Sequence, residues 1–115
     1  MRLKSALWVA AYLRRCQVEG IPAVVRRRGA EEAGAVFVRI SRLDGTSDLF
    51  GPAPQSAFDA APGAERAFSA SLMEQPAPDA VVEAYLAREL KFDSDIWIIE
   101  VEERSGRNFL DVVTG

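Results

Sequence analysis

The stretch from Ala35 to Phe50, AVFVRISRLDGTSDLF, decides the fold. Two β-type runs flank Asp44-Gly45, a dipeptide that favours a two-residue type I′ turn because both central residues of that turn need a positive φ. Such a turn would pair Ile40 with Leu49 in an antiparallel hairpin and would place Val38 on the same face as this pair. The opposite face of the predicted hairpin carries Phe37, Arg39 and Phe50.

The second strong strand signal is the apolar run Ile96 to Ile99, IWII, which continues to Glu102. Strands of antiparallel sheets that face water on one side alternate apolar and polar residues, and this run does not alternate. We therefore expect cover on both faces of the sheet at this strand, with Trp97 largely buried. Either helices on both sides or a dimer that covers one side would supply that cover.

A helix and a strand are predicted on the N-terminal side of the hairpin. Ser5 can cap a helix that runs to about Glu19, and Gly20 suits its end. A strand over Leu7 to Tyr12 is the alternative. Ile21 to Arg27 has the composition of a strand, with a proline at its start where a missing N–H is tolerated, and residues 29–34 form a loop.

Two further helices are predicted between the hairpin and Ile96. Gly51 to Gly63 is rich in proline and alanine and indicates a loop, and Ala64 to Glu74 has the pattern of a short helix. Pro76-Ala-Pro78 ends that helix, and Asp79 then caps a stronger helix that reaches about Lys91. After Glu102, we expect residues 108–113 to return as an edge strand.

These elements define the fold class as α+β, in a single domain over residues 1–115. The predicted sheet is largely antiparallel, with four to five strands, because hairpins dominate the pattern. About three helices accompany it, and the order is α-β-β-β-α-α-β with a further strand at the end. The sheet is expected to be covered on both faces.

Several chemistries are excluded by composition. The chain has no histidine and a single cysteine, Cys16, which removes Ser-His-Asp and Cys-His catalysis, histidine-containing zinc sites and thiolate metal clusters. No glycine-rich phosphate-binding motif occurs, so we expect no cofactor. With no catalytic base beside it in the sequence, Cys16 is interpreted as a small packed residue.

The expected location is the cytoplasm. No apolar run approaches the roughly 20 residues that a membrane span needs. The N-terminus opens like a signal peptide, but Arg14-Arg15 interrupts its apolar stretch and no cleavage site follows. The lone cysteine gives no sign of an oxidising compartment.

Charge is distributed unevenly along the chain, whose net charge is −3. Residues 1–43 hold nine Lys and Arg against three Asp and Glu, whereas residues 44–115 hold five against fourteen. One interpretation is that the two halves face each other, within one fold or across a homodimer. The other is that the basic half binds nucleic acid or another acidic partner.

Five arginines form the candidate surface for an acidic partner: Arg26, Arg27, Arg28, Arg39 and Arg42. In a regular strand the first and third of the consecutive arginines share one face and the second points to the other. The alternative is a solvated, charged end of a hairpin. RNA-binding sheets combine basic and aromatic residues, and the face with Phe37, Arg39 and Phe50 has that composition.

Carboxylates cluster around the C-terminal strand, at Asp93, Asp95, Glu100, Glu102 and Glu103. Glu100 and Glu102 would share a strand face about 7 Å apart, and Lys91 is the only lysine near them. Such a set can bind Mg²⁺ or perform acid–base chemistry. A solvated strand end is the alternative.

Three segments of the chain together resemble a known family: RLKSALWVAAYLRR, VVRRRGAEEAGAVFVRISRLDGTSDLFGPAPQ and LARELKFDSDIWIIEVEERSGRNFLD. They are similar to a small, mostly alphaproteobacterial family of unknown function, domain-of-unknown-function family 1491. The resemblance covers nearly the whole chain and is weakest between Ser56 and Pro78. It implies a cytosolic bacterial protein of α/β character and implies no activity or site residue.

The function predicted from these observations is that of a non-catalytic interaction module that self-associates. One alternative is a nucleic-acid or acidic-partner binder that uses the basic N-terminal half. The other is a carboxylate-dependent divalent-metal enzyme.

Overall fold

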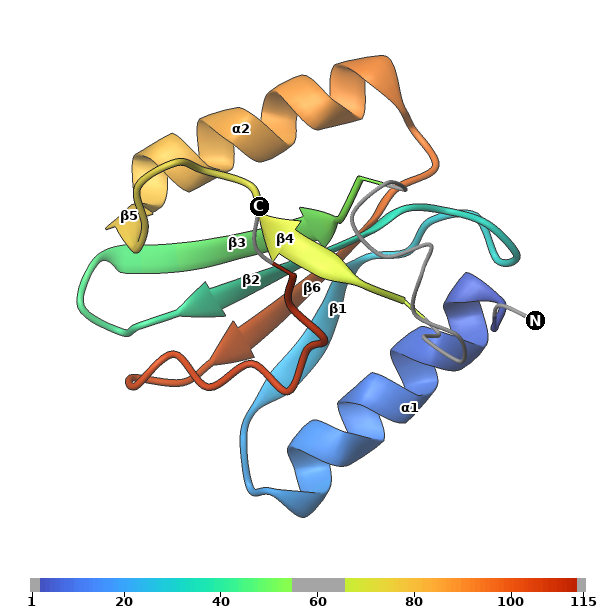
Figure 1. Ribbon diagram of the computed structural model, residues 1–115, viewed down its shortest axis with the longest axis horizontal. Helices are drawn as coiled ribbons and strands as arrows, with labels where there is room; N and C mark the ends of the chain where they lie inside the picture. The colour runs from blue at the N-terminus through green and yellow to red at the C-terminus, as the bar shows by residue number, and fades with distance from the viewer. Residues whose placement is uncertain (1–2, 55–65, 114–115) are drawn as a thin grey trace.

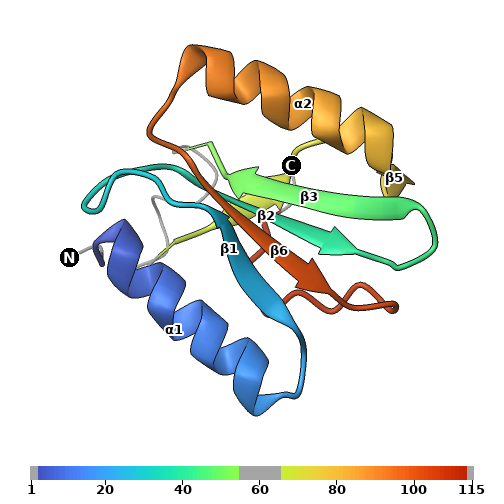
Figure 2. The same cartoon turned by 180° about the vertical axis from the view of Figure 1, so that it is seen from behind.

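A six-stranded mixed sheet with one helix on each face forms the protein, as seen in a computed structural model that describes residues 3–54 and 66–113 (Figures 1 and 2). The strand order is β1-β6-β2-β3-β4, and β5 pairs with the start of β3. The elements in chain order are α1 (Ser5–Val18), β1 (Ala23–Arg27), β2 (Val36–Ser41), β3 (Thr46–Pro52), β4 (Phe68–Ala70), β5 (Ala77–Pro78), α2 (Asp79–Phe92) and β6 (Trp97–Glu102).

The strand β6 lies between β1 and β2, and this position explains its unbroken apolar run. Trp97 and Ile99 contribute to the core under α1, whereas Ile98 contributes to the core under α2, and all three are at most 1% exposed. The prediction of cover on both faces is confirmed, and two helices of the same chain supply it. Each such side chain stabilises the fold by about 1.5–3 kcal/mol through burial.

The helix α1 is joined to the rest of the fold at both ends. The N–H groups of Ser5 and Ala6 donate to the carbonyl oxygens of Glu32 and Glu31, at 3.0 and 2.9 Å, so a neighbouring loop satisfies the first turn. Gly20, with φ +74°, ends the helix as predicted. Cys16 is fully buried in the core beneath α1, in agreement with its interpretation as a packed residue.

The hairpin of β2 and β3 forms, but its register differs by one residue from the prediction. Ile40 pairs with Asp48 instead of Leu49, because the loop between the paired residues Arg42 and Thr46 holds three residues, with positive φ at Leu43 and Gly45. A shift of one residue reverses the faces of the second strand. Leu49 consequently packs under α2, and Phe50 joins Val38 and Ile40 under α1.

The prediction of a largely antiparallel sheet is only partly right: four of the five strand pairings are antiparallel, but β6 enters the sheet parallel to β2, so the sheet is mixed. The strands β1 and β2 follow each other in the chain but do not pair, since β6 separates them. The loop that joins β1 to β2 crosses the start of β6, where side chains at Gly29 or Gly34 would collide with the backbone at Asp95. These two glycines permit the close backbone approach that the crossing requires.

The predicted helix over Ala64 to Glu74 is also wrong for its described part. Phe68–Ala70 forms β4, which pairs with the end of β3, and the described residues contain two helices. Pairing with an open strand edge has overridden the local helical pattern. In place of the expected edge strand at 108–113, the structure shows a single bridge between Val112 and Phe68. Most of the loop predicted over residues 51–63 lies outside the described residues.

Neither helix in the described part of the chain is long and apolar enough to cross a membrane.

Candidate interaction surface at the β1 edge

Two of the five predicted surface arginines, Arg26 and Arg39, join an ion-pair network between the sheet and α2. Arg39 donates from Nη1 to both carboxylate oxygens of Glu100, at 2.9 and 2.7 Å, and its Nη2 lies 2.9 Å from an oxygen of Asp79. Arg26 donates hydrogen bonds from Nη1 and Nη2 to the two carboxylate oxygens of Glu83, at 2.7 and 2.6 Å, and from Nη1 to Glu100 at 3.0 Å. Two guanidinium groups therefore form ion pairs with three carboxylates.

The pKa values of Asp79, Glu83 and Arg26 are shifted in the directions expected for paired charges. A hydrogen bond from the Ser47 hydroxyl is the main cause that lowers the pKa of Asp79, with Arg39 adding to it. The hydrogen bond from Arg26 lowers the pKa of Glu83, and the same contact raises the pKa of Arg26. Asp79 and Glu83 therefore stay charged at neutral pH.

A third predicted arginine, Arg42, also pairs within the chain. Its Nε donates to the buried carboxylate of Asp48 at 2.7 Å, next to Ile40 on the α1 face of the sheet. Its guanidinium packs against Gly106, where any side chain would collide with it. The basic N-terminal half of the chain thus meets the acidic half inside one fold at Arg26, Arg39 and Arg42, which agrees with the first interpretation of the charge asymmetry.

The remaining two arginines, Arg27 and Arg28, have no carboxylate partner within the described ranges. Arg27 donates to the carbonyl oxygen of Ser94 at 2.7 Å, and the guanidinium of Arg28 lies 4.9 Å from the centroid of the Trp97 ring. Trp97 belongs to the core on the α1 side, so Arg28 lies on that side of the sheet, whereas Arg26 contacts Glu83 on α2. The prediction that Arg26 and Arg28 share one face is therefore wrong. An irregularity of register between Val25 and Arg27 breaks the alternation.

The strand β1 is an edge strand with exposed apolar residues. No other described strand pairs with its outer side, and Val24 is 61% exposed. On one flank a shallow groove runs between α1 and β1, lined in part by Ala10, Arg14 and Ile21. On the other flank a depression is lined by Pro22, Ala23, Val24, Arg39, Ser41, Glu100 and Glu102.

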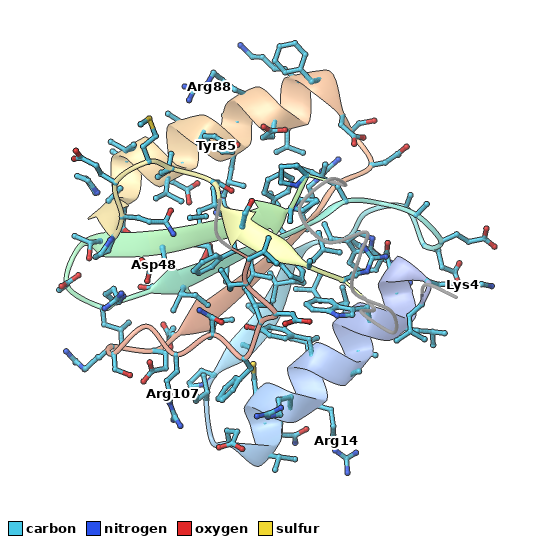
Figure 3. The ribbon with its side chains drawn as sticks, in the orientation of Figure 1. Lys4, Arg14, Asp48, Tyr85, Arg88 and Arg107 are labelled. Carbon is cyan, nitrogen blue, oxygen red and sulfur yellow. The ribbon has the colours of Figure 1, made fainter. Side chains whose placement is uncertain are left out.

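The side of α1 that faces away from the sheet also carries exposed apolar residues. Leu7 and Val18 are exposed, and they lie on one stripe with Arg14, which projects away from the sheet (Figure 3). Natural edge strands are protected from uncontrolled pairing by prolines, charges and bulges. The strand begins at Ala23, and the irregularity after Val25 sets such a limit here, so the edge that is open to a regular partner strand is confined to residues 23–25.

The five carboxylates named from the sequence do not come together. Asp93 and Asp95 precede β6, whereas Glu102 and Glu103 lie at and beyond its end. Glu100 does lie on the same sheet face as Glu102, as expected, but two arginines hold it. Glu103 accepts hydrogen bonds from Ser105 Oγ and the Arg107 N–H, which lower its pKa. Among the described residues, no group of three acidic or thiol side chains could hold a metal ion.

Sequence reasoning missed Asp79 and Glu83 as partners of the arginines. Both stand one helical turn apart at the start of α2, where carboxylates interact favourably with the helix dipole. An acidic pair at this spacing was the available signal. The arginines that it meets come from strands far away in the chain.

These features define the class of protein: a small α+β domain with a mixed sheet, an ion-paired face beside α2 and an open edge at β1. The chain belongs to the family described as protein of unknown function DUF1491, whose sequence profile matches residues 3–111. The resemblance found in the sequence is thereby confirmed.

Solved structures of similar proteins have the same fold. A solution structure of protein Atu0922 from A. tumefaciens is 42% identical to the chain, with a TM-score of 0.82, and the match covers 100% of this chain and 98% of that one. A crystal structure of a DUF1491 family protein from Caulobacter crescentus CB15 is 34% identical, with a TM-score of 0.79 and coverage of 99% and 100%. No curated protein matches the chain.

Proposed function

We propose that this protein is a non-catalytic interaction module that self-associates through the edge of β1. The observation that carries the proposal is the short open edge at residues 23–25, with exposed Val24 at its centre and grooves on both flanks. Exposed apolar residues on an unpaired strand are a template for pairing with another chain. A second copy of this chain is the occupant that fits best.

Backbone geometry favours a two-fold antiparallel pairing centred on Val24. The N–H of Glu102 donates to the carbonyl of Pro22 at 3.0 Å, which identifies Pro22 as a residue whose backbone faces β6. Because hydrogen-bonding direction alternates along a strand, Ala23 and Val25 face outward. In the proposed pair, Ala23 of each copy is opposite Val25 of the other.

Charge complementarity supports the same arrangement. Arg27 and Arg28 stand at the end of β1, whereas Glu19 and Glu102 stand near its beginning. An antiparallel pair therefore sets the basic end of one copy beside the acidic end of the other, at both ends of the contact. The two α1 helices then lie on one face of the joined sheet.

The test is the molar mass of the protein in solution. We expect the wild type to sediment as a dimer at concentrations on the order of 100 μM, a range suited to a weak interface of limited area. Val24→Asp introduces a charge at the two-fold axis and is expected to give a monomer. Val81→Asp is the matched control, since Val81 is also exposed but lies on α2, and this variant keeps the wild-type mass. A monomeric wild type, or equal masses for all three proteins, would contradict the proposal.

The alternative of an acidic or nucleic-acid partner rests on Arg27 and Arg28, the two members of the predicted surface that are not held by carboxylates of the described chain. The metal-enzyme alternative has less support, because two guanidinium groups already compete for Glu100.

A further inference from the structure

A cavity of about 380 Å³ lies near the edge of the sheet that is opposite to β1. It is lined by β2, β3, β4 and the last turns of α2. Its size falls in the range of about 300–1,000 Å³ that is usual for small-molecule sites. Buried Phe37, Gly51 and Ile96 contribute to its apolar lining. The polar lining consists of Ser69, Ser71, Tyr85, Glu89 and Asp93.

The two carboxylates of the cavity lack a cationic partner. At the start of α2, outside the cavity, Asp79 and Glu83 are held by Arg39 and Arg26. No lysine or arginine of residues 3–54 and 66–113 pairs with Glu89 or Asp93. The same helix thus has a neutralised acidic pair at its start and an uncompensated pair at its end.

The position of this second pair increases its electrostatic cost. Asp93 is the C-cap residue of α2 and Glu89 lies in its last turn. The C-terminus of a helix carries a partial negative charge, which disfavours carboxylates and favours cations. Glu89 is half-buried, whereas Asp93 is exposed and its Oδ1 accepts the N–H of Asp95 at 2.9 Å. A cation bound in the cavity would relieve the repulsion between these carboxylates and the helix end.

Tyr85 links the carboxylates to the hydroxyl groups of the cavity. It extends from α2 (Figure 3), and its hydroxyl group interacts with the side chains of Ser71 and Glu89. Burial and then the negative charge of Glu89 raise the pKa of Tyr85, so the phenol stays protonated at neutral pH. The guanidinium of Arg88 lies 5.8 Å from the centroid of the Tyr85 ring, and the ring of Phe37 adds further aromatic surface to the lining, of the kind that attracts organic cations over its face.

We infer that this cavity binds a small organic cation, an amine or guanidinium compound. Glu89 and Asp93 neutralise the charge of the ligand, and aromatic rings contact its apolar part. The hydroxyl oxygens of Ser69 and Ser71 accept hydrogen bonds from its N–H groups. The site lies near the opposite edge of the sheet from the proposed interface, so it stands independently of self-association.

Agmatine, which carries a guanidinium and an ammonium group, is a suitable probe. We would titrate it into the ¹⁵N-labelled protein at physiological salt and follow the amide signals. Saturable shifts are expected at Ser71, Tyr85 and Glu89. The uncharged analogue 1,4-butanediol is expected to cause no saturable shift at these residues.

Two double variants separate the cavity from general charge effects. Glu89→Gln with Asp93→Asn keeps the shape of the cavity and removes both charges, and we expect its affinity for agmatine to fall at least tenfold. Glu31→Gln with Asp111→Asn removes the same charge from exposed positions outside the cavity, and its affinity should stay within twofold of the wild type.

The melting temperature without ligand distinguishes binding from structural roles. Removal of two carboxylates from a helix C-terminus relieves repulsion, so the cavity variant should melt at the same temperature as the wild type or higher. The inference is overturned if agmatine does not saturate the wild type, if the diol binds equally well, or if the two double variants bind agmatine with equal affinity.

Discussion

Arg39 extends from β2 toward α2 and contacts side chains from three elements of the fold. Its partners are Ser47 on β3, Asp79 on α2 and Glu100 on β6. Only 13% of its side chain is exposed, so water screens these contacts less than those of the other arginines in the salt bridges. A charge held in this way stabilises the fold, but its removal also leaves its carboxylate partners uncompensated.

The first prediction at this scale is that Arg39→Met lowers the free energy of unfolding by about 2–3 kcal/mol, the usual range for a lost hydrogen bond to a charged group in a partly buried place. Methionine keeps the apolar stem, so the loss reports on the guanidinium. Lys4→Met is the control, since Lys4 forms an exposed pair with Glu32 at 3.5 Å, and we expect a change below about 0.5 kcal/mol. Urea denaturation measures both, and equal midpoints would contradict the role assigned to Arg39.

At the scale of elements, the loop between β2 and β3 shows how a local signal can predict an element and yet miss its register. Asp44-Gly45 correctly indicated a reversal of the chain, but Leu43 adopts a φ of +62° and adds a third residue to the loop. The side chain of Asp44 then accepts hydrogen bonds from the N–H and the hydroxyl of Thr46, at 3.0 and 2.6 Å. A leucine in the left-handed region is uncommon, and no pattern in the sequence announces it.

This loop gives a prediction for Gly45, whose φ is +91° and which has no heavy atom within 4 Å of an added Cβ. Any loss of stability on substitution therefore arises from the backbone alone. We expect Gly45→Val to lower the free energy of unfolding by more than about 1 kcal/mol, because a β-branched residue strongly disfavours positive φ. Gly45→Asn should lose less, since asparagine enters the left-handed region more readily. A valine variant as stable as the asparagine variant would contradict this account.

The elements that sequence predicted well are those with strong local patterns. The apolar run of β6 correctly indicated burial on both faces, and Gly20 correctly indicated the end of α1. The position of β6 between β1 and β2 was not predicted, because strand order depends on contacts between distant segments. Gly29 and Gly34, at the two ends of the crossing loop, were the local trace of that arrangement.

The candidate surface was predictable only as a set of arginines. Composition identified all five, but their partners come from other elements, and the pairing of Arg26 with Glu83 depends on the placement of α2. The open edge at β1 could not be predicted either, because a strand becomes an edge only when the order of the whole sheet is known.

At the scale of the whole molecule, internal pairing limits what the basic half can offer to a polyanion. Arg26, Arg39 and Arg42 are bound to carboxylates of the chain, which leaves Arg27 and Arg28 from the predicted set. We expect labelled DNA or RNA to bind weakly at low salt, with a slope of log K against log salt no steeper than about −2, since each neutralised phosphate in duplex DNA contributes about −0.9.

A fluorescence anisotropy titration from low to physiological salt measures this slope. The variant with Arg27→Glu and Arg28→Glu is the comparison, and its binding at low salt should be weaker than that of the wild type, because both unpaired guanidinium groups are lost. Micromolar binding at physiological salt that is lost on this charge reversal would instead establish the acidic-partner reading.

The place of β6 in the sheet also has a consequence for synthesis on the ribosome. The last of the described strands, β6, lies inside the sheet between β1 and β2, so a nascent chain that has emerged only as far as α2 presents β1 and β2 with a missing strand between them. Neither helix can then cover a complete apolar layer. Domains in general fold as units, and this one must wait for its C-terminal residues to leave the exit tunnel before either half of its core can close.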